Sequence, residues 1–354
     1  MVDRVLLAEP RGFCAGVEMA IKALAWMVRA FNPPVYCYHE IVHNRLVVDR
    51  FRELGVVFVE SVDEVPPGAP LMLSAHGSAP EVVAAARENG RFVVNAVCPL
   101  VTKVHHEAKV RANKGYTILY VGHEGHDEAT GTLAVAPAAM RLVEDEADLE
   151  DTLPSVEDPS RVALLAQTTL SLHDWEGIME RARAAYPALW TASRNDLCFA
   201  TTNRQAALRE LATRADAVVV IGSSNSSNTI ALAKVAEEAG CRRVLRVDGA
   251  HELDVDALAD AAVVGVTAGA SAPEDLVQAV INKLAPRDGV EPVFVTDEVE
   301  YFPPPRELRE LLPVLDTLAA LLLGADPGAS RALGGPFSDD RTIDASDVLA
   351  GLSR

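Results

Sequence analysis

Three of the five cysteines lie where a thiolate could bind a metal. Cys14, Cys98 and Cys198 each come just before a segment with helical periodicity, and they are spaced along the chain like successive α/β units. A thiol at the amino terminus of a helix has a depressed pKa, and its thiolate is the form that binds metal. Three converging thiolates would suit an iron–sulfur cluster in which one iron lacks a protein ligand. Spacing alone also permits three inert cysteines, since the chain has no Cys-x-x-Cys pair.

The other two cysteines, Cys37 and Cys241, lack this context and are interpreted as buried and inert. An odd number of cysteines spread over the whole chain is not typical of a secreted disulfide framework. The first residues also lack the apolar stretch of a secretory signal. No apolar run approaches the ~18–20 residues that cross a membrane. We therefore expect a cytoplasmic protein with free thiols and no membrane partner.

Several histidines follow apolar segments in short polar turns, where a binding site is expected. His43 and His76 belong to two such turns, and a third contains His123 and His126. A lone histidine is more often satisfied by hydrogen bonding, but several in such turns indicate a site. A zinc-dependent hydrolase using His123, His126 and Glu128 is one alternative from these residues. Their spacing differs from the helical His-Glu-x-x-His pattern.

Two loops after apolar segments have the composition of anion-binding cradles. Residues 222–229 (GSSNSSNT) and 269–271 (GAS) each join an apolar run to a segment with helix-forming residues. Backbone N–H groups and hydroxyls at such a helix start bind phosphate without a lysine. Neither a Gly-x-x-x-x-Gly-Lys-Ser/Thr loop nor a Gly-x-Gly-x-x-Gly sequence follows an expected strand. This disfavours a nucleotide-driven enzyme and an enzyme that transfers hydride.

The composition is that of an acidic globular protein. Of the 354 residues, 49% are hydrophobic, and 51 acidic against 32 basic residues give a net charge of −19. This length and hydrophobic share suffice for two or three domains with buried cores. So acidic a chain lacks the basic surface that neutralises a phosphate backbone, and we expect no nucleic-acid partner. A small anionic substrate is compatible with this charge, because local hydrogen-bond donors decide its binding.

Short apolar runs alternate with segments of helical periodicity along most of the chain. In residues 17–31 the apolar positions recur at steps of four and three, which predicts a helix. The expected strands cover residues 4–8, 70–74, 91–94, 116–121, 162–166, 217–221 and 262–266. This alternation predicts an α/β fold with mostly parallel sheets. Ligands of such sheets gather at the carboxyl ends of the strands, where the polar turns lie.

A short repeat and an unusual tail add to this pattern. The sequence Ser-Ala-Pro-Glu occurs at residues 78–81 and again at 271–274, which fits a helix start and favours duplicated modules around a shared site. Residues 307–323 have the pattern of one helix, interrupted by Pro313. From residue 326 onward Gly, Pro, Ser, Ala and Asp dominate, and this composition predicts a tail of low order.

Several long motifs combine these candidate residues. In chain order they are residues 10–17 (PRGFCAGV), 39–44 (HEIVHN), 74–77 (SAHG), 98–105 (CPLVTKVH), 125–128 (GHDE), 167–170 (QTTL), 198–205 (CFATTNRQ), 222–228 (GSSNSSN) and 269–273 (GASAP). Together they resemble the 4-hydroxy-3-methylbut-2-enyl diphosphate reductases, the last enzymes of the methylerythritol phosphate route to isoprenoids. The resemblance runs from residue 4 to about residue 308. It departs at residues 95–97 (NAV), where the family commonly has Asp-Ala-Thr, and a change of hydrogen bonding next to Cys98 would alter the reduction potential of a cluster bound there.

The resemblance implies three pseudo-symmetric α/β modules in a trefoil around a central iron–sulfur cluster. The expected modules are residues 14–98, residues 99–197, and residues 198–285 together with 1–13. A C-terminal segment, residues 286–325, would pack on this core. Residues 326–354 would form the tail of low order, for which the resemblance supplies no role.

The implied activity is that of an iron–sulfur reductase. It would remove the C4 hydroxyl of (E)-4-hydroxy-3-methylbut-2-enyl diphosphate with two electrons and two protons, giving isopentenyl diphosphate, dimethylallyl diphosphate and water. The implied cofactor is one [4Fe–4S] cluster with three protein ligands, Cys14, Cys98 and Cys198. Since no flavin or nicotinamide motif is present, the electrons would come from a separate carrier of the ferredoxin or flavodoxin type.

The resemblance also implies roles around the substrate. Glu128 would supply a proton, and the Thr168 hydroxyl would position the substrate oxygen and relay that proton. The residues implied to bind the substrate are His43, His76, His126, Thr168, Ser226, Ser227, Asn228 and Ser271. A non-catalytic sensor that holds a cluster is a second alternative, and the tail is the only candidate for its partner surface.

Overall fold

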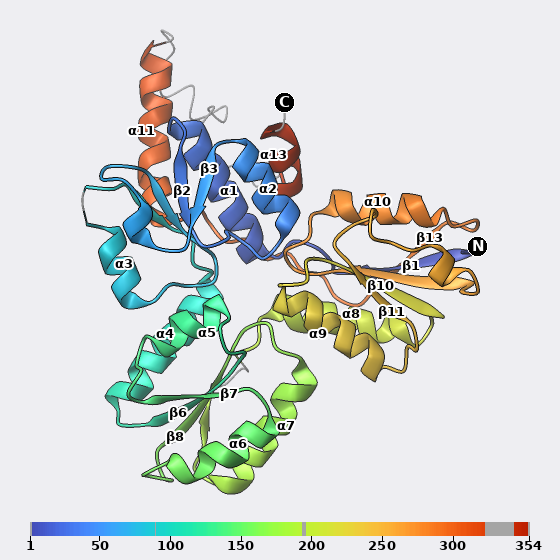
Figure 1. Ribbon diagram of the computed structural model, residues 1–354, viewed down its shortest axis with the longest axis horizontal. Helices are drawn as coiled ribbons and strands as arrows, with labels where there is room; N and C mark the ends of the chain where they lie inside the picture. The colour runs from blue at the N-terminus through green and yellow to red at the C-terminus, as the bar shows by residue number, and fades with distance from the viewer. Residues whose placement is uncertain (1, 89, 193–195, 323–342, 353–354) are drawn as a thin grey trace.

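Three parallel β-sheets with flanking helices form three lobes around a common centre (Figure 1). The structure is a computed structural model that describes residues 2–88, 90–192, 196–322 and 343–352. Every strand pair in these residues is parallel. The expected α/β fold, with three modules in a trefoil, is confirmed.

The first lobe contains a four-stranded sheet with the spatial order β3-β2-β4-β5. Its strands are β2 (Val35–Tyr38), β3 (Val56–Val59), β4 (Leu71–Leu73) and β5 (Val93–Asn95), and its helices are α1 (Ala15–Ala30), α2 (Arg45–Glu53) and α3 (Pro80–Ala86). The core lies where the apolar face of α1 meets this sheet, and it buries Leu24, Met27 and Cys37 completely. This packing fixes the direction of α1, and therefore the position of its amino terminus.

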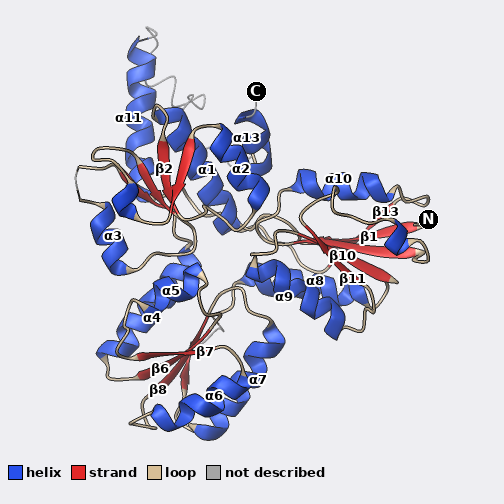
Figure 2. Ribbon diagram, in the orientation of Figure 1, coloured by secondary structure: helices blue, strands red, loops and turns tan. Residues whose placement is uncertain are grey.

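The second lobe contains a sheet with the order β7-β6-β8-β9. Its strands are β6 (Thr117–Val121), β7 (Met140–Val143), β8 (Val162–Ala166) and β9 (Trp190–Thr191), and its helices are α4 (Pro99–Asn113), α5 (Asp127–Leu133), α6 (Glu146–Thr152) and α7 (Leu172–Ala185). All five residues of β8 are buried. A continuous apolar run of this kind is typical of a parallel strand with helices on both faces of its sheet (Figure 2).

The third lobe contains a five-stranded sheet with the order β11-β10-β12-β1-β13, in which the first strand of the chain lies between strands from residues 263–294. Its strands are β1 (Arg4–Glu9), β10 (Ala217–Ile221), β11 (Val244–Val247), β12 (Val263–Ala268) and β13 (Val290–Phe294), and its helices are α8 (Phe199–Ala212), α9 (Ser227–Glu238) and α10 (Glu274–Leu284). In the register of β1 with β12, Leu6 pairs with Gly265. There Leu211 of α8 occupies the space that a side chain at Gly265 would need.

The expected strands are present as β1, β4, β5, β6, β8, β10 and β12. The pattern did not predict β2, β3, β7, β9, β11 and β13, which are short or partly exposed. In β11, for example, only Val247 is buried. β13 contains Pro292, which cannot donate a hydrogen bond, and this strand lies at the sheet edge, where a missing donor is tolerated.

The C-terminal residues divide between two lobes. β13 completes the sheet of the third lobe, whereas α11 (Arg306–Leu322) continues through Pro313 as one helix and buries Leu308 in the core of the first lobe. A second helix, α13 (Ala345–Leu352), packs on α1 through Ala345 and Leu349, which lie one turn apart on the same face. The expectation of low order is therefore wrong for residues 345–352. Residues 326–342 and 353–354 of that expected tail lie outside the described residues.

None of the helices in the described ranges has both the length and the apolar composition needed to cross a bilayer.

Candidate active site

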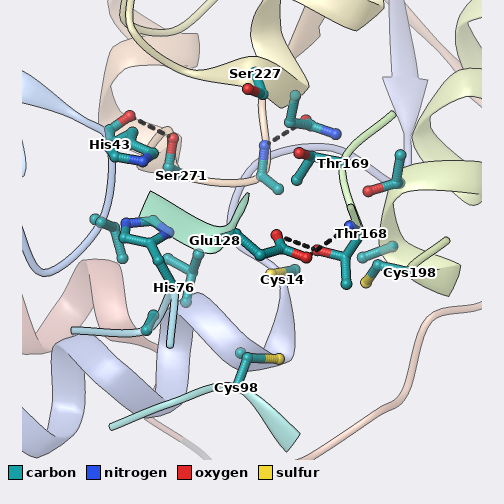
Figure 3. Close-up of a pocket in the computed structure, with 18 of the residues that line it drawn as sticks. Cys14, His43, His76, Cys98, Glu128, Thr168, Thr169, Cys198, Ser227 and Ser271 are labelled. Atoms are coloured by element: carbon teal, nitrogen blue, oxygen red, sulfur yellow. Dashed lines mark hydrogen bonds between the residues drawn. The ribbon is translucent and has the colours of Figure 1, made fainter. Parts of the chain in front are cut away.

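Each of the three candidate cysteines begins a helix of a different lobe. Cys14 is the N-cap of α1, Cys98 of α4 and Cys198 of α8. Their backbone N–H groups donate to carbonyl oxygens of the turns that follow three central strands: Cys14 to Ala270 at 3.2 Å, Cys98 to Ala75 at 3.0 Å, and Cys198 to Thr168 at 3.0 Å. Each of these bonds joins the first turn of a helix in one lobe to a strand end of another, and the three cysteines lie around one pocket (Figure 3).

The space between the cysteines suits a group larger than a single ion. A Cβ atom at Gly16 would lie only 2.7 Å from the Cys98 sulfur and in van der Waals contact, at 3.9 Å, with the Cys14 sulfur, so glycine leaves room for Cys98. The three sulfurs do not all lie within 4.8 Å of one another, and they are thus too far apart to share one metal ion. Three thiols around a wider gap are the donor set of an iron–sulfur cluster, and the residues fit such a group.

Burial governs the ionisation of these thiols. Burial raises the pKa of all three thiols, and it raises that of Cys98 to about 12. Backbone N–H groups in the first turn of each helix oppose this rise, and so does the charge of Arg204 beside Cys14. The expected depression of the pKa is therefore wrong for the metal-free protein, because desolvation outweighs the helix terminus. A bound metal would instead stabilise the thiolate form, since it deprotonates its thiol ligands.

A buried carboxyl group lies beside the cysteines. Glu128, on α5, is 2% exposed and accepts two hydrogen bonds from Thr168, at 2.8 Å from its backbone N–H and at 2.9 Å from its hydroxyl. Burial raises the pKa of Glu128 to about 7, although both hydrogen bonds from Thr168 lower it; the charge of Asp196 adds to the rise. A carboxyl with this pKa holds a proton near neutral pH and can release it, as a general acid must.

His126 presents one nitrogen to the cavity and uses the other to begin α5. Its Nδ1 accepts the backbone N–H of Glu128 at 3.1 Å. Burial lowers the pKa of His126 to about 4, and the neighbouring His43 lowers it further. The neutral ring therefore carries its hydrogen on Nε2, because Nδ1 acts as an acceptor. His126 is thus a fixed neutral donor.

Two further histidines stack against each other in the same place. The rings of His43 and His76 are 3.9 Å apart and only 12° from parallel, and His126 meets His43 edge-on at 5.0 Å. Nε2 of His76 is buried without a hydrogen-bond partner, and the two buried ring nitrogens of His43 face carboxylates only at longer range, Glu40 at 3.6 Å and Asp127 at 3.9 Å. Burial, followed by the neighbouring His43, lowers the pKa of His76 well below its usual value. These nitrogens are available to a polar ligand.

The first turn of α9 supplies hydroxyl and amide donors. Ser226 Oγ accepts the backbone N–H of Thr229 at 3.3 Å, and Ser227 Oγ accepts from Gln167 at 3.3 Å, so neither hydroxyl uses its hydrogen in these bonds. Asn228 Oδ1 accepts the backbone N–H of Ala270 at 2.9 Å, whereas its buried Nδ2 has no partner. Three hydrogen-bond donors at one helix start are typical of an anion site.

All twelve residues predicted for the site from the sequence and the family resemblance border one cavity. It is lined by Cys14, Cys98, Cys198, His43, His76, His126, Glu128, Thr168, Ser226, Ser227, Asn228 and Ser271, together with apolar residues (Figure 3). Ser271 also lines this cavity, and its hydroxyl donates a hydrogen bond to the His43 carbonyl at 2.8 Å.

Sequence reasoning missed three residues that organise this cavity. Thr169 lines it, and Gln167 is completely buried, donating to Thr169 at 2.9 Å and to Ser227 in the next lobe. Asp127 bonds His39 of the first lobe at 2.7 Å, and this bond lowers its pKa to about 2 despite burial. All three lie inside the quoted motifs, but the contacts of Gln167 with Ser227 and of Asp127 with His39 join residues that are distant in sequence.

The predicted zinc alternative finds no support in this geometry. His123 is exposed, and Nδ1 of His126 is occupied by the helix cap. Within the described ranges, the only three metal-ligating side chains that approach within 4.8 Å of one another are His43, His76 and Asp127. Ring lone pairs lie in the plane of each imidazole, so the two parallel stacked rings cannot both direct one at the same ion.

Comparisons with known proteins agree with this architecture. Residues 5–285 match the family model of the LytB protein. The chain is 48% identical over 308 residues to the 4-hydroxy-3-methylbut-2-enyl diphosphate reductase of Rhodopirellula baltica, covering 86% of this chain and 96% of that one, and 46% identical to the Mycobacterium leprae enzyme of the same name, covering 86% and 92%.

Two solved structures of reductases have a similar fold. The structure of the E-1-hydroxy-2-methyl-but-2-enyl-4-diphosphate reductase from Plasmodium falciparum superposes with a TM-score of 0.83 at 31% identity, covering 88% of this chain and 98% of that one. A second reductase structure, described as the terminal enzyme of the non-mevalonate pathway, has a TM-score of 0.58 at 30% identity and covers 80% and 99%. Sequence, fold and site together show that this chain belongs to the LytB protein family.

Proposed function

We propose that this protein is a 4-hydroxy-3-methylbut-2-enyl diphosphate reductase of isoprenoid biosynthesis. Curated relatives with this name align over nearly their whole length at 46–48% identity. The observation that carries the proposal is the convergence of three cysteines at helix starts, a buried carboxyl and a group of hydrogen-bond donors without protein acceptors on one cavity. No simpler binding function would need all three.

Cys14, Cys98 and Cys198 would hold one [4Fe–4S] cluster as its only protein ligands. When bound, such a cluster supplies electrons and, at an iron without a protein ligand, a Lewis-acid site. The gap kept open at Gly16 and the spacing of the three sulfurs support this ligand set. A reducing cytoplasm, which keeps thiols free, suits it as well.

The diphosphate would bind to the donors on the side of the cavity formed by the first and third lobes. Asn228 Nδ2, His76 Nε2 and the hydroxyls of Ser226 and Ser227 have no competing protein acceptor among the described hydrogen bonds. His43 would donate from a ring nitrogen that otherwise faces a carboxylate, Glu40 at 3.6 Å or Asp127 at 3.9 Å. Ser271 would have to turn its hydrogen away from the His43 carbonyl in order to donate. Neutral donors in a buried site bind an anion without the cost of burying further charge.

Glu128 and Thr168 would deliver the proton that leaves with the C4 hydroxyl as water. In its protonated form, Glu128 can donate from Oε2 to the Thr168 hydroxyl, which lies 2.9 Å away and can pass its own hydrogen on. The bond from the Thr168 N–H to Oε1 keeps the carboxyl in this orientation.

The two electrons would come from a separate carrier of the ferredoxin or flavodoxin type. The absence of nucleotide-binding motifs from the sequence supports an external donor.

The function is tested with protein purified without oxygen, supplied with the substrate and a chemical reductant. We expect bound iron and sulfide, together with formation of isopentenyl and dimethylallyl diphosphates. Iron and sulfide without any conversion would favour a cluster-containing sensor instead. Zinc in place of iron, with hydrolysis of the substrate, would favour the hydrolase.

The rate of the proton-dependent step should fall as the pH rises. The pKa of Glu128, raised by burial to about 7, means that the acid form dominates below that pH and is lost above it. We therefore expect the single-turnover rate to be constant at lower pH and to decrease about tenfold per pH unit above about pH 7. The measurement is the rate at saturating substrate in a series of buffers. A rate that stays level to about pH 9 would show that another group supplies the proton.

Replacing Asn228 with alanine should weaken substrate binding without changing the cluster. It removes the Nδ2 donor and also leaves the N–H of Ala270 without its acceptor. A lost hydrogen bond to a charged group costs about 1.5–3 kcal/mol, or more than tenfold in affinity. Diphosphate affinity is measured by titration, with Asn225→Ala as the control, because Asn225 is in the same loop but its amide bonds Glu40 at an exposed position. Equal affinities of Asn228→Ala and wild type would exclude this loop from the site.

A further inference from the structure

A buried arginine lies directly behind the cysteine cavity. Arg204, on α8, is 1% exposed and is the largest fully buried side chain in the described residues. Its charge is matched by Glu298, which follows β13 and whose side chain is 9% exposed. Asn203 donates to Glu298 at 3.0 Å and holds the carboxylate in place. A buried charge pair of this kind is retained only when its geometry is well satisfied.

All five N–H groups of this guanidinium are used. Nε and Nη2 donate to the Gly12 carbonyl at 3.0 and 2.8 Å, and Nη2 also donates to the Phe13 carbonyl at 3.1 Å. Nη1 donates to the Ala200 carbonyl at 2.9 Å and to Glu298 at 2.9 Å. A lysine ammonium has only three donors and no planar fork, so it could not make the same set of bonds.

The backbone groups that Arg204 binds flank two of the three cysteines. Gly12 and Phe13 immediately precede Cys14, and Ala200 lies in the first turn of the helix that Cys198 begins. Arg204 therefore joins two loops that are almost two hundred positions apart in the sequence. It has no described bond to the loop of Cys98. The bonds of Arg204 therefore connect the loops of Cys14 and Cys198 only.

We propose that Arg204 is a positioning residue that fixes the Cys14 loop against the start of α8 before any cluster is bound. Its bonds hold the two cysteines in the relative position that the cluster requires, so that binding the cluster need not order them. The importance of this for activity rests on the proposed function, but the ordering itself belongs to the metal-free protein. A merely structural arginine would instead stabilise the whole third lobe.

The five cysteines allow these roles to be separated. In metal-free Arg204→Lys protein, the rate of iodoacetamide labelling is measured at each cysteine by mass spectrometry. We expect Cys14 and Cys198 to react at least about fivefold faster than in wild type, because their loops open locally. Cys98 should change little because Arg204 does not hold its loop. The two core thiols, Cys37 and Cys241, report global unfolding.

Two further variants sharpen the comparison. Glu298→Gln retains the arginine and its bonds to backbone carbonyls but removes the matching negative charge. It should increase the labelling rates of Cys14 and Cys198 by less than Arg204→Lys does. Arg214→Lys, at an exposed pair with Glu291, should leave all five rates unchanged. After anaerobic reconstitution, Arg204→Lys should also lose iron to a chelator faster than Arg214→Lys does.

The outcomes are distinct. Selective acceleration at Cys14 and Cys198 supports the positioning role. No acceleration, equal acceleration at Cys98, or a rise at all five thiols in both Arg204→Lys and Glu298→Gln would overturn it. If wild-type protein bound no iron although the selective labelling pattern was present, the proposed function would fail while the ordering by Arg204 would stand.

Discussion

Replacing Cys14, Cys98 or Cys198 with serine is expected to abolish turnover and to remove most of the bound iron. A serine hydroxyl is a poor substitute for a thiolate, and a cluster held by only three protein ligands cannot lose one and remain firmly bound. The loops themselves should persist, because each cysteine is anchored through its backbone N–H rather than its sulfur. The measurements are iron and sulfide per chain, the visible absorption of the cluster, and turnover with a chemical reductant.

The remaining two cysteines provide matched controls. Cys241→Ser keeps a donor for the Arg243 carbonyl, which the Cys241 thiol meets at 3.4 Å. Cys37 is completely buried, so alanine is the better replacement there, because a buried serine hydroxyl would lack a partner. Both controls should keep their iron and their activity. If Cys241→Ser lost as much iron as Cys98→Ser, the ligand assignment would be wrong.

Glu128→Gln should slow the reaction about 10²–10⁴-fold while leaving the cluster intact, the loss that removing a general acid typically causes. Glutamine keeps the shape of the side chain and can still accept the Thr168 N–H through its oxygen. What it lacks is a proton that it can release near neutral pH. The variant should therefore bind substrate with nearly normal affinity and fail in the step that needs the proton.

This prediction is measured by single-turnover reduction, with iron content determined on the same sample. Glu124→Gln is the matched control, since Glu124 is exposed in the same turn and should tolerate the change. The decrease of the rate above about pH 7 should also disappear in Glu128→Gln, because the group that titrates has been removed. A rate within fivefold of wild type would mean that the proton comes from elsewhere. Loss of metal would instead indicate that Glu128 is a ligand.

The protonation of the site illustrates how far the environment overrides residue type. A glutamate is ordinarily ionised at neutral pH and a cysteine at a helix start is ordinarily acidic. Here burial raises the pKa of Glu128 to about 7 and that of Cys98 to about 12. Both shifts favour the neutral form of the group in the absence of metal. The geometry of the lobes, more than the identity of the side chains, thus decides which groups carry protons.

The sequence predicted the fold class, and the motifs of the family resemblance predicted the candidate residues of the site. Continuous apolar runs such as those of β8 and β10, alternating with helical segments, are typical of parallel strands buried between two layers of helix. The cysteines, histidines and serine-rich loop were recognisable because each lies in a turn between a strand and a helix. A local pattern of this kind is visible in a window of a few residues.

Only the tertiary structure decided how these turns meet and what surrounds them. The short strand β13 and the helix α13 form because they find partners far away in the sequence, β1 and α1, and their own patterns are too weak to predict them. The pairs of Arg204 with Glu298 and of Asp127 with His39 are likewise invisible in any local window. Long-range packing brings these groups together and removes them from water, and this sets both the positions of the cysteine loops and the protonation of Glu128.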